Sequence, residues 1–428
     1  MNFRFLILAL TSLCLTSICS NMIAFHVTML CDGPATPQRD TISIWAVSIG
    51  SILATLPFNL LYARYGARYV FAIAGTISFV STALIPVAHT IGFVPFVALR
   101  FLQGVAFASN FAGIGMVTSR WACLDENGFF MAAMTIFSQI SVILTNPLAG
   151  ALCYSELGWK SVYYFLSAIG LLLFGLWFFL YNDYPEKHRF VSESERKKIM
   201  EGKNVESRRL DGYVPYRQIC TNKIILVVWF NAFGDIISAI FLLTYFPQYL
   251  TDVLGYSLEK AAVLSMLPAI SHIPSKLAFG WIFDKTKFMS EINKMRICNT
   301  IALFGSAAFF ILVGFVPRDL PALAVTFSTI NYACIGANCG GFYKCGSLVS
   351  RQFTHFVIAN VQFLKCVSFF ISPLMVLLFV HDSKERDDWR VIFFIMAAVL
   401  IVGNFLFCYF VSDQPAEFTK LSKNVKVY

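Results

Sequence analysis

About twelve long apolar segments constrain this 428-residue chain more than any other feature of its sequence. A helix that crosses the hydrocarbon core of a bilayer needs about 20 mostly apolar residues. The segments are residues 5–30, 42–63, 69–90, 93–119, 129–154, 160–181, 223–250, 259–284, 297–316, 320–346, 354–380 and 389–411. Only 13% of the residues are charged, against about 25% in soluble domains. The sequence therefore predicts an all-α membrane protein with twelve transmembrane helices. It excludes a β-barrel, whose strands alternate over about ten residues.

The first segment, FRFLILALTSLCLTSIC, also has the features of a secretory signal peptide, with Arg4 as its basic start. Its apolar character continues past Asn21 and His26 to Leu30, which is long for such a peptide. We therefore expect this segment to be retained as the first span, with cleavage as the alternative.

Lysine and arginine indicate the orientation, because both are enriched in cytoplasmic loops. With a cytoplasmic N-terminus, about 22 of them fall on the cytoplasmic side and about 7 on the other side. We expect an integral, multi-pass protein with both termini in the cytoplasm. Whether it resides in the plasma membrane or in an endomembrane vesicle or lysosome stays open. The net charge of +9 reflects this bias and indicates no nucleic-acid partner.

A long polar segment, residues 182–222, divides the apolar segments into six and six. Two such halves are typical of secondary transporters built from repeats. We expect an N-terminal six-helix bundle at 1–181, a cytoplasmic linker at 182–222, a C-terminal six-helix bundle at 223–411 and a cytoplasmic tail at 412–428.

Within the linker, Ser192 and Glu195 form an S-x-x-E capping box. This pattern predicts a short helix from about residue 193 to 202. We expect a solvated linker helix, and contact of its basic face with anionic headgroups is the alternative.

The loop after the second span reads NLLYARYGARYVF and resembles the G-x-L-a-D-R-x-G-R loop of the major facilitator superfamily. In the first half Asn59 and Ala63 replace the glycine and the aspartate of that pattern. Arg100-x-x-Gln103-Gly104 resembles the R-x-x-Q-G motif of the fourth span. The loop residues that match, in the two halves, are Arg64, Gly66 and Arg68, and Gly280, Asp284 and Lys285.

An ordered set of motifs narrows the resemblance. SRWACLDE, NPLAGALCYSELGWKSVYYFLSAIG, YPEKHRFVSESERKKI, PQYLTDVLGYSLEKAAVLSMLP and DDWRVIFFIMAAVLI are similar to the family of sialin, vesicular glutamate transporters and type I sodium–phosphate cotransporters. The resemblance implies two pseudo-symmetric six-helix bundles with an anion site between them. It also implies secondary active transport of a small organic or inorganic anion by alternating access. The coupling ion would be a proton or sodium, with no other cofactor, and the protein would be monomeric.

In that family the loop motif holds helix ends together through ion pairs and a tight turn in one conformation. We therefore assign the six loop residues to gating. The loss of the aspartate at Ala63 puts the latch of the first half in doubt.

Arg100 stands in a long apolar run, where a guanidinium at the bilayer centre costs about 2.5–3.5 kcal/mol on insertion scales. A stripe of small residues, Gly104, Ala108 and Ala112, follows it at helical spacing and favours close approach of another helix. We expect Arg100 to face a substrate cavity, and the family resemblance implies that it binds organic anions. The alternative is an arginine that reaches the external interface from the helix end.

Other polar side chains also lie inside apolar segments. Asp235 is expected either to couple transport to protons or to form a salt bridge with Lys276 or Lys365. Asn21 and Lys365 are candidate substrate ligands, although cross-helix hydrogen bonding is the alternative for Asn21. His272 is a candidate proton relay, but a structural histidine is the more common case. Lys276 and Lys344 either face the cavity or lie near cytoplasmic helix ends.

Most of the 12 cysteines lie inside apolar segments, and no Cys/His spacing indicates a metal site. Cys31 and Cys153 are expected near the external face. A bridge between them is possible, but free thiols are expected.

Three positions depart from the family pattern. Cys19, Ile44 and Phe107 replace a first-span arginine, a second-span histidine and a fourth-span glutamate of vesicular glutamate transporters. Glutamate is therefore poorly supported as cargo, and a non-transporting sensor or adaptor is the alternative function. An enzyme is not expected, because no H-E-x-x-H, G-x-S-x-G or phosphate-loop motif occurs.

Overall fold

The computed structural model describes residues 3–31, 37–123, 130, 133–200, 215–286, 288–317, 319–350 and 353–420. Over these ranges the chain forms helices and no strand, as the sequence predicts. The chain separates into two compact units, Met1–Ser207 and Arg208–Tyr428. They are called unit 1 and unit 2 below.

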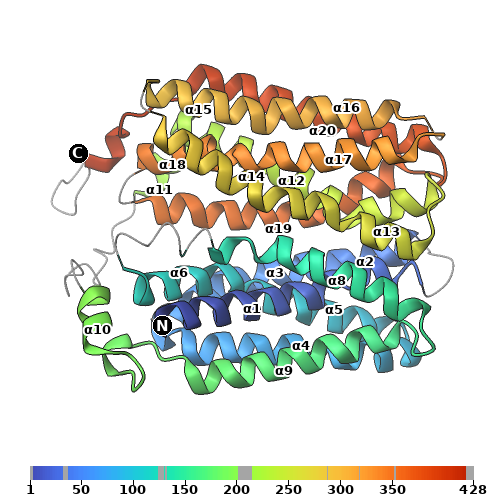
Figure 1. Cartoon of the computed structure of the whole chain (residues 1–428), viewed down its shortest axis with the longest axis horizontal. Coiled ribbons are helices and arrows are strands. Elements are labelled where there is room, and N and C mark those ends of the chain that lie inside the picture. The colour runs from blue at the N-terminus through green and yellow to red at the C-terminus, as the bar shows by residue number, and fades with distance from the viewer. Residues whose placement is uncertain are drawn as a thin grey trace. The chain divides into compact units, whose positions relative to one another are not determined.

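The long helices of unit 1 run side by side along one direction (Figure 1). They are α1 (Phe3–Ile23), α2 (Phe25–Thr28), α3 (Pro37–Tyr65), α4 (Ala67–Ile91), α5 (Phe93–Phe107), α6 (Ser109–Trp121), α8 (Phe137–Tyr154), α9 (Lys160–Leu180), η2 (Pro185–Lys187) and α10 (Glu193–Met200). The first predicted span comprises α1 and α2, and the fourth comprises α5 and α6.

Unit 2 has the same kind of architecture, with more interruptions along its helices. Its elements are α11 (Tyr216–Thr221), α12 (Lys223–Asp252), α13 (Leu258–Leu264), α14 (Met266–Lys285), α15 (Glu291–Asn299), η4 (Thr300–Gly305), α16 (Ser306–Phe315), α17 (Pro321–Ile335), η5 (Gly336–Gly340), α18 (Phe342–Ser350), α19 (Thr354–Phe379), α20 (Arg386–Phe410) and η7 (Glu417–Lys420).

Eleven helical segments in the described part of the chain are long and apolar enough to cross a membrane. The predicted span 320–346 is not one of these eleven, because its helix is interrupted. The segment instead divides into α17, the 3-10 turn η5 and α18. The turn η5 packs closely against α14, and this contact requires a glycine at the start of the turn. A Cβ on Gly336 would lie 2.8 Å from the backbone nitrogen of Lys276 in α14.

Helices α3 and α5 approach each other through glycines. A Cβ on Gly104 of α5 would overlap the carbonyl oxygen of Val47 in α3, and a Cβ on Gly50 would overlap that of Phe101. The Ser51 hydroxyl also donates a hydrogen bond of 2.9 Å to the Gly104 carbonyl. Gly104, the first residue of the predicted stripe of small residues, therefore permits close packing of α5 on α3.

The linker helix α10 begins as its capping box predicts, because the Ser192 hydroxyl accepts a hydrogen bond from the Glu195 backbone at 3.3 Å. The Glu195 carboxylate does not complete the box. It accepts hydrogen bonds from the backbone N–H groups of Phe3 at 3.0 Å and Arg4 at 2.9 Å, the first two residues of α1. Glu195 and Ile199 are buried. The outer face of α10 is exposed, as expected of a solvated linker helix, but its buried face was not predicted, because Glu195 there caps α1.

This contact also bears on the first segment. Most of α1 is buried inside unit 1, and its N-terminal N–H groups are satisfied by a residue about 190 positions later. Such integration favours retention of the segment over its removal as a signal peptide.

We predict that Gly104→Ala destabilises unit 1, although alanine is the better helix former by about 1 kcal/mol. The added methyl group would overlap the Val47 carbonyl, and overpacking of this kind costs about 1–3 kcal/mol. The matched control is Gly115→Ala in α6, where a Cβ would meet nothing within 4 Å. The melting temperature of the purified chain in detergent should fall only for Gly104→Ala. Equal melting temperatures for the two variants would contradict the packing described for α3 and α5.

We also predict that Glu195→Gln lowers the melting temperature by about 2–4 °C, since loss of a helix cap costs about 1 kcal/mol and unit 1 is about 200 residues long. The amide keeps one acceptor but loses the charge that favours a helix N-terminus. Glu193→Gln, an exposed position of the same helix, is the control and should melt like the parent chain. A shift of the same size for both variants would show that the cap on α1 is energetically unimportant.

Candidate functional site

The Arg100 guanidinium is buried in unit 1, with only 1% of the residue exposed. Its Nη1 donates hydrogen bonds to the carbonyl oxygen of Met22 at 3.0 Å and to Oε1 of Gln103 at 2.6 Å. Its central carbon lies 4.6 Å from the ring centroid of Phe25, a cation–π contact. The alternative of an arginine reaching the external interface is therefore wrong.

The acceptor at Met22 exists because the first span is interrupted. Helix α1 ends at Ile23, and α2 begins at Phe25 after a turn at Ala24. The last carbonyl groups of a helix lack partners within the helix. Two of these carbonyls, from neighbouring residues, are used by the side chains of the fourth span. Arg100 therefore binds the backbone at a helix break.

Gln103 connects Arg100 with Asn21. Its Nε2 donates to the Asn21 carbonyl at 3.1 Å and to the Thr82 hydroxyl at 2.8 Å. The Asn21 side chain donates to the Ser78 hydroxyl at 2.9 Å, while its Oδ1 is buried without a hydrogen-bond partner. The structure thus brings together Arg100 and Asn21, two predicted substrate ligands. It also adds Gln103, whose place in the R-x-x-Q-G motif was its only signal in the sequence.

The charge of Arg100 has no carboxylate partner among the described residues. Its contacts are two neutral oxygens and an aromatic ring, and its buried Nε has no hydrogen-bond partner. A guanidinium carries five N–H donors, so some of its capacity stays unused. A buried cation in this state creates a positive potential that favours an anion.

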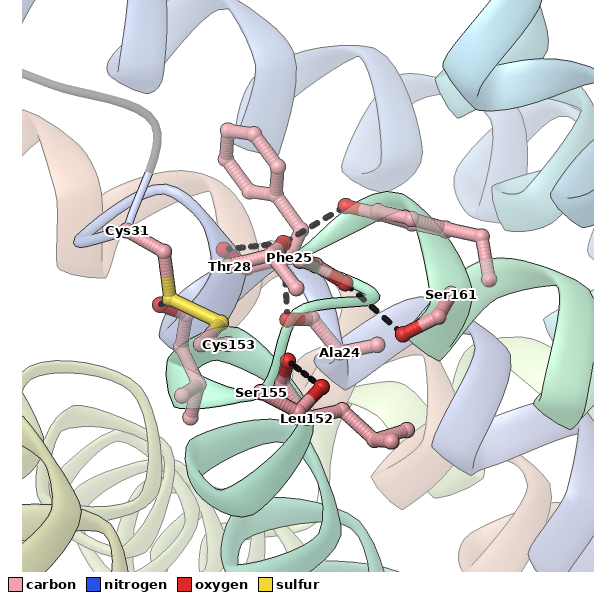
Figure 2. Close-up of a disulfide and its surroundings, with 11 residues drawn as sticks. Ala24, Phe25, Thr28, Cys31, Leu152, Cys153, Ser155 and Ser161 are labelled. Atoms are coloured by element: carbon pink, nitrogen blue, oxygen red, sulfur yellow. Dashed lines mark hydrogen bonds between the residues drawn. A yellow bond between two sulfur atoms is a disulfide. The ribbon is translucent and has the colours of Figure 1, made fainter.

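A disulfide between Cys31 and Cys153 fixes the segment that carries Phe25 (Figure 2). The two Cα atoms are 6.1 Å apart, and the bond joins the end of the α2 region to the end of α8. Nearby, the hydroxyl groups of Thr28 and Tyr163 share a hydrogen bond of 2.7 Å. The expectation of free thiols is wrong here, because α2 and α8 end at the same side of unit 1. The disulfide therefore restrains the segment that carries Phe25, the ring in contact with Arg100.

Asp235 of α12 is the corresponding buried charge of unit 2, with 3% of the residue exposed. Its Oδ2 accepts a hydrogen bond of 2.9 Å from Asn338, and its buried Oδ1 has no partner. Neither Lys276 nor Lys365 forms an ion pair with Asp235 in the described part of the chain. The salt bridge predicted as one alternative is therefore absent at contact distance.

The remaining candidates of unit 2 lie on two other helices, α14 and α19. His272 of α14 is buried, and its Nδ1 makes a hydrogen bond of 3.1 Å with the carbonyl oxygen of Tyr332. That contact suits the structural role. Lys276 is half-buried on α14, and Lys365 is half-buried on α19.

The loop of the first half is held by an aspartate outside its motif. The carboxylate of Asp183, just after α9, accepts hydrogen bonds from the N–H groups of Ala67 at 2.7 Å and Arg68 at 3.2 Å, where α4 begins. Gly66 has φ +77°, and a Cβ there would crowd this carboxylate. Asp183 thus occupies a helix N-terminus next to the loop whose own aspartate is replaced at Ala63. The only sequence signal was an acidic residue directly after the sixth span.

The predicted ion-pair clamp of this loop is not formed among the described residues of unit 1. The Arg68 guanidinium donates through Nε and Nη2 to the Phe178 carbonyl at 3.2 and 3.0 Å. Arg64 is exposed, and no ion pair of its side chain occurs among the described residues. Carbonyl contacts and a capped helix end therefore hold this turn.

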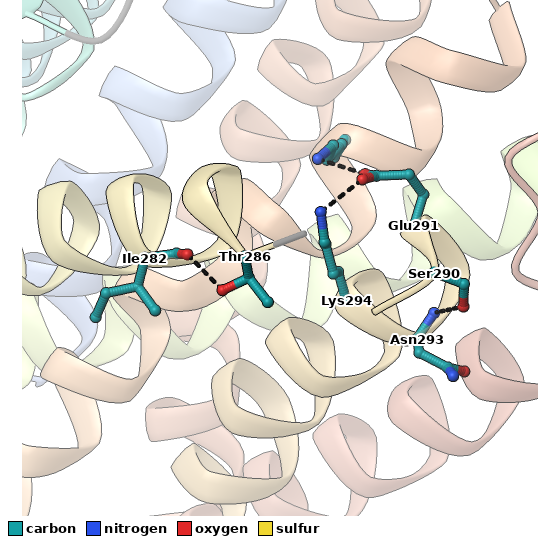
Figure 3. A network of polar contacts seen from close by, with 7 residues as sticks. Ile282, Thr286, Ser290, Glu291, Asn293 and Lys294 are labelled. Carbon is teal, nitrogen blue, oxygen red and sulfur yellow. Dashed lines mark hydrogen bonds and ion pairs between the residues drawn. The ribbon is translucent and has the colours of Figure 1, made fainter. Parts of the chain in front are cut away.

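In the second half, the acidic residue that organises the loop region is Glu291, at the start of α15 (Figure 3). Its two carboxylate oxygens pair with Lys294 and Lys344, each at 2.7 Å. Lys344 therefore lies at a helix end rather than deep in the membrane, one of its two expected places. Gly280 lies within α14, while the side chains of Asp284 and Lys285 fall outside the described residues.

The three positions that depart from the family pattern are buried. Cys19 and Ile44 are each 3% exposed, and Phe107 is 1% exposed. They belong to the apolar core of unit 1, where a charged side chain would need a partner.

Comparison with known proteins identifies the family. Residues 36–373 match the model of the Major Facilitator Superfamily. Sialin of Homo sapiens is 25% identical over 373 residues, which cover 85% of this chain and 74% of sialin. The "Probable small intestine urate exporter" of Mus musculus is 24% identical over 391 residues, which cover 90% of this chain and 78% of that protein.

A solved structure shows the same fold. The crystal structure of a D-xylose-proton symporter superposes with a TM-score of 0.72 at 14% identity, covering 96% of this chain and 98% of that one. The family match over most of the sequence confirms the resemblance seen in its motifs. The chain belongs to the major facilitator superfamily, a family of membrane transporters and not of enzymes, and its relatives include sialin and a urate exporter.

Proposed function

We propose that this protein is a secondary active transporter of a small anion, with Arg100 binding the negative group of the substrate. The observation that carries the proposal is a buried guanidinium that has neutral acceptors but no carboxylate partner among the residues that the structure describes. Keeping such a charge unpaired is costly. An anion that enters the site would offset this cost, which is a physical reason for binding.

The surroundings of Arg100 indicate what kind of anion fits. A guanidinium binds planar carboxylate-like or phosphate-like groups through paired hydrogen bonds. The Phe25 ring, 4.6 Å from the guanidinium carbon, adds an apolar face next to the charge. An organic anion with a flat, partly apolar body therefore suits the site better than a small hydrated ion. Urate is one such compound, and one relative is named as a urate exporter.

Asp235 is the proposed coupling residue. It is a buried carboxylate that, over the described ranges of the chain, accepts one hydrogen bond, from Asn338, and forms no ion pair. A proton or a sodium ion that neutralises such a group lowers the cost of its burial. In this proposal Lys276, Lys365 and His272 form its surroundings in unit 2.

The proposed cycle is alternating access, in which the N-terminal and C-terminal bundles move against each other. The boundaries predicted from the sequence, 1–181 and 223–411, remain the proposed limits of the two bundles. The six loop residues assigned to gating keep that proposed role, supported in the first half by the Asp183 cap. In this proposal a monomer carries out the whole cycle.

Both termini are proposed to face the cytoplasm. The basic loops support this orientation. The disulfide of Cys31 with Cys153 adds a second argument, because it lies at the end of unit 1 away from the start of α1. Disulfides persist on the extracellular or lumenal side of membranes.

We predict that Arg100→Gln reduces anion uptake at least about tenfold, because the loss of one buried charged partner costs about 2–5 kcal/mol. Uptake of radiolabelled urate and phosphate into proteoliposomes measures the effect, and the melting temperature checks that the variant folds. The control is Arg39→Gln, an exposed arginine whose guanidinium lies over the Phe93 ring. Unchanged uptake by Arg100→Gln would overturn the proposed anion site. Ligand binding by the parent chain without counterflow would instead establish the sensor or adaptor function.

We further predict that Asp235→Asn removes the response of uptake to imposed proton or sodium gradients while substrate exchange continues. The amide cannot be charged, so the step in which an ion neutralises the site is lost. Asp252→Asn, near the end of the same helix and partly exposed, should keep the full response. Gradient dependence that survives in Asp235→Asn would assign the coupling to another residue.

A further inference from the structure

An apolar groove lies on unit 1 between α3 and α4, outside the candidate anion site. Its volume is about 290 Å³, and it is lined by Phe58, Leu61, Tyr65, Tyr69, Val70 and Ile73. These residues come from the last two turns of α3 and the first two turns of α4, so the groove lies beside the turn at Gly66. It therefore opens near the membrane surface on the side where α1 begins.

The groove has a buried floor and exposed walls. Phe58 and Val70 are 6% and 4% exposed, whereas Tyr65, Tyr69 and Ile73 are each more than half exposed. A polar solute gains nothing from such a surface, because aliphatic and aromatic carbon makes up the floor. Its volume is at the lower end of the range of ligand pockets. A segment of an acyl chain has the chemistry and the dimensions to fill it.

Two arginines stand next to the tyrosines that line the groove. The guanidinium of Arg64 lies 5.4 Å from the centroid of the Tyr65 ring, and that of Arg68 lies 5.8 Å from the Tyr69 ring. Arg64 is exposed, and no carboxylate pairs with it in the described part of the chain. Tyrosines with adjacent arginines are typical of the membrane–water interface.

The two arginines differ in their freedom. Two donors of Arg68 are committed to the Phe178 carbonyl, so its guanidinium is held in place. Arg64 keeps its donors for a ligand, and its position beside Tyr65 brings its charge to the mouth of the groove. Basic pockets between helices on the cytoplasmic side of membrane proteins bind anionic headgroups.

We propose that this groove is a binding site for one anionic phospholipid of the leaflet that faces the start of α1. An acyl chain lies against Phe58 and Val70, between the tyrosines, and the phosphate is bound by Arg64 with Arg68 beside it. The site uses neither Arg100 nor Asp235. It shares Arg64 and Arg68 with the proposed gating loop, but lipid retention is measured without transport, so a failure of this proposal is distinguishable from a failure of the proposed anion transport.

The test uses the full chain purified in detergent, with phosphatidylglycerol and phosphatidylcholine of identical acyl chains. Native mass spectrometry measures retained lipid, and the melting temperature measures stabilisation. We expect phosphatidylglycerol to be retained and to raise the melting temperature more than phosphatidylcholine. Inorganic phosphate and glycerol 3-phosphate should have no effect, because they lack the acyl chain.

Two pairs of variants locate the site. Arg64→Gln should weaken retention of phosphatidylglycerol about fivefold, the ratio that corresponds to about 1 kcal/mol per basic residue at a membrane surface. Arg189→Gln, an exposed arginine in the linker, is its control. Leu61→Trp should fill the groove and reduce retention of the same lipid. Its control is Leu60→Trp, at a more exposed position of α3 that does not line the groove.

Equal retention of the two lipids by the parent chain would overturn the proposal. So would unchanged retention of phosphatidylglycerol in both Arg64→Gln and Leu61→Trp. If inorganic phosphate reproduced the stabilisation, the groove would have no part in binding, and the proposal would be wrong. Melting temperatures in lipid-free detergent show whether the variants fold, so a loss of lipid is not mistaken for a loss of structure.

Discussion

The burial of a guanidinium against an interrupted helix is the interaction on which the functional proposal depends. Arg100 could not remain in the core of unit 1 without acceptors, and an intact first helix would offer none. The turn at Ala24 frees the carbonyl oxygens of Asn21 and Met22, and Gln103 and Arg100 bind them. The break in the first span and the charge in the fourth thus require each other. Since the acceptors are neutral, the positive charge stays available to a ligand.

Unit 2 shows the same principle with the opposite charge. Asp235 is bound by Asn338, which lies in the 3-10 turn between α17 and α18. Interrupted helices that present polar groups within the membrane are a feature of secondary transporters. In each unit a buried charge inside an apolar span, Arg100 or Asp235, is thus bound at a helix break. A nearby pair of glycines, Gly340 and Gly341, accompanies the break in unit 2 and packs against Cys298 and Asn299.

Three acidic side chains organise the loop ends of the two units. Glu195 caps α1, Asp183 caps α4, and Glu291 joins α15 to α18 through Lys344. The first two are carboxylates at helix N-termini, where backbone N–H groups and the helix dipole favour negative charge. Glu195 connects the linker to the start of α1, and Asp183 connects the end of α9 to the start of α4. Asp183 thereby stabilises the loop between α3 and α4, which has lost the aspartate of its own motif at Ala63.

The sequence by itself determined the membrane class, the helix positions and the family. Apolar segments of about 20 residues have few alternatives in a bilayer, and the motif around Arg100 is local along the chain. The sequence also singled out Arg100, Asn21 and Asp235, because a polar residue within an apolar segment is visible without a structure. Only the tertiary structure decided what these residues contact, since their partners come from distant positions. Asn338 lies about 100 residues from Asp235, and Cys153 is 122 residues from Cys31. The Glu195 cap was hidden for the same reason: a capping box describes one helix, whereas this carboxylate caps another that only the folded chain brings near it.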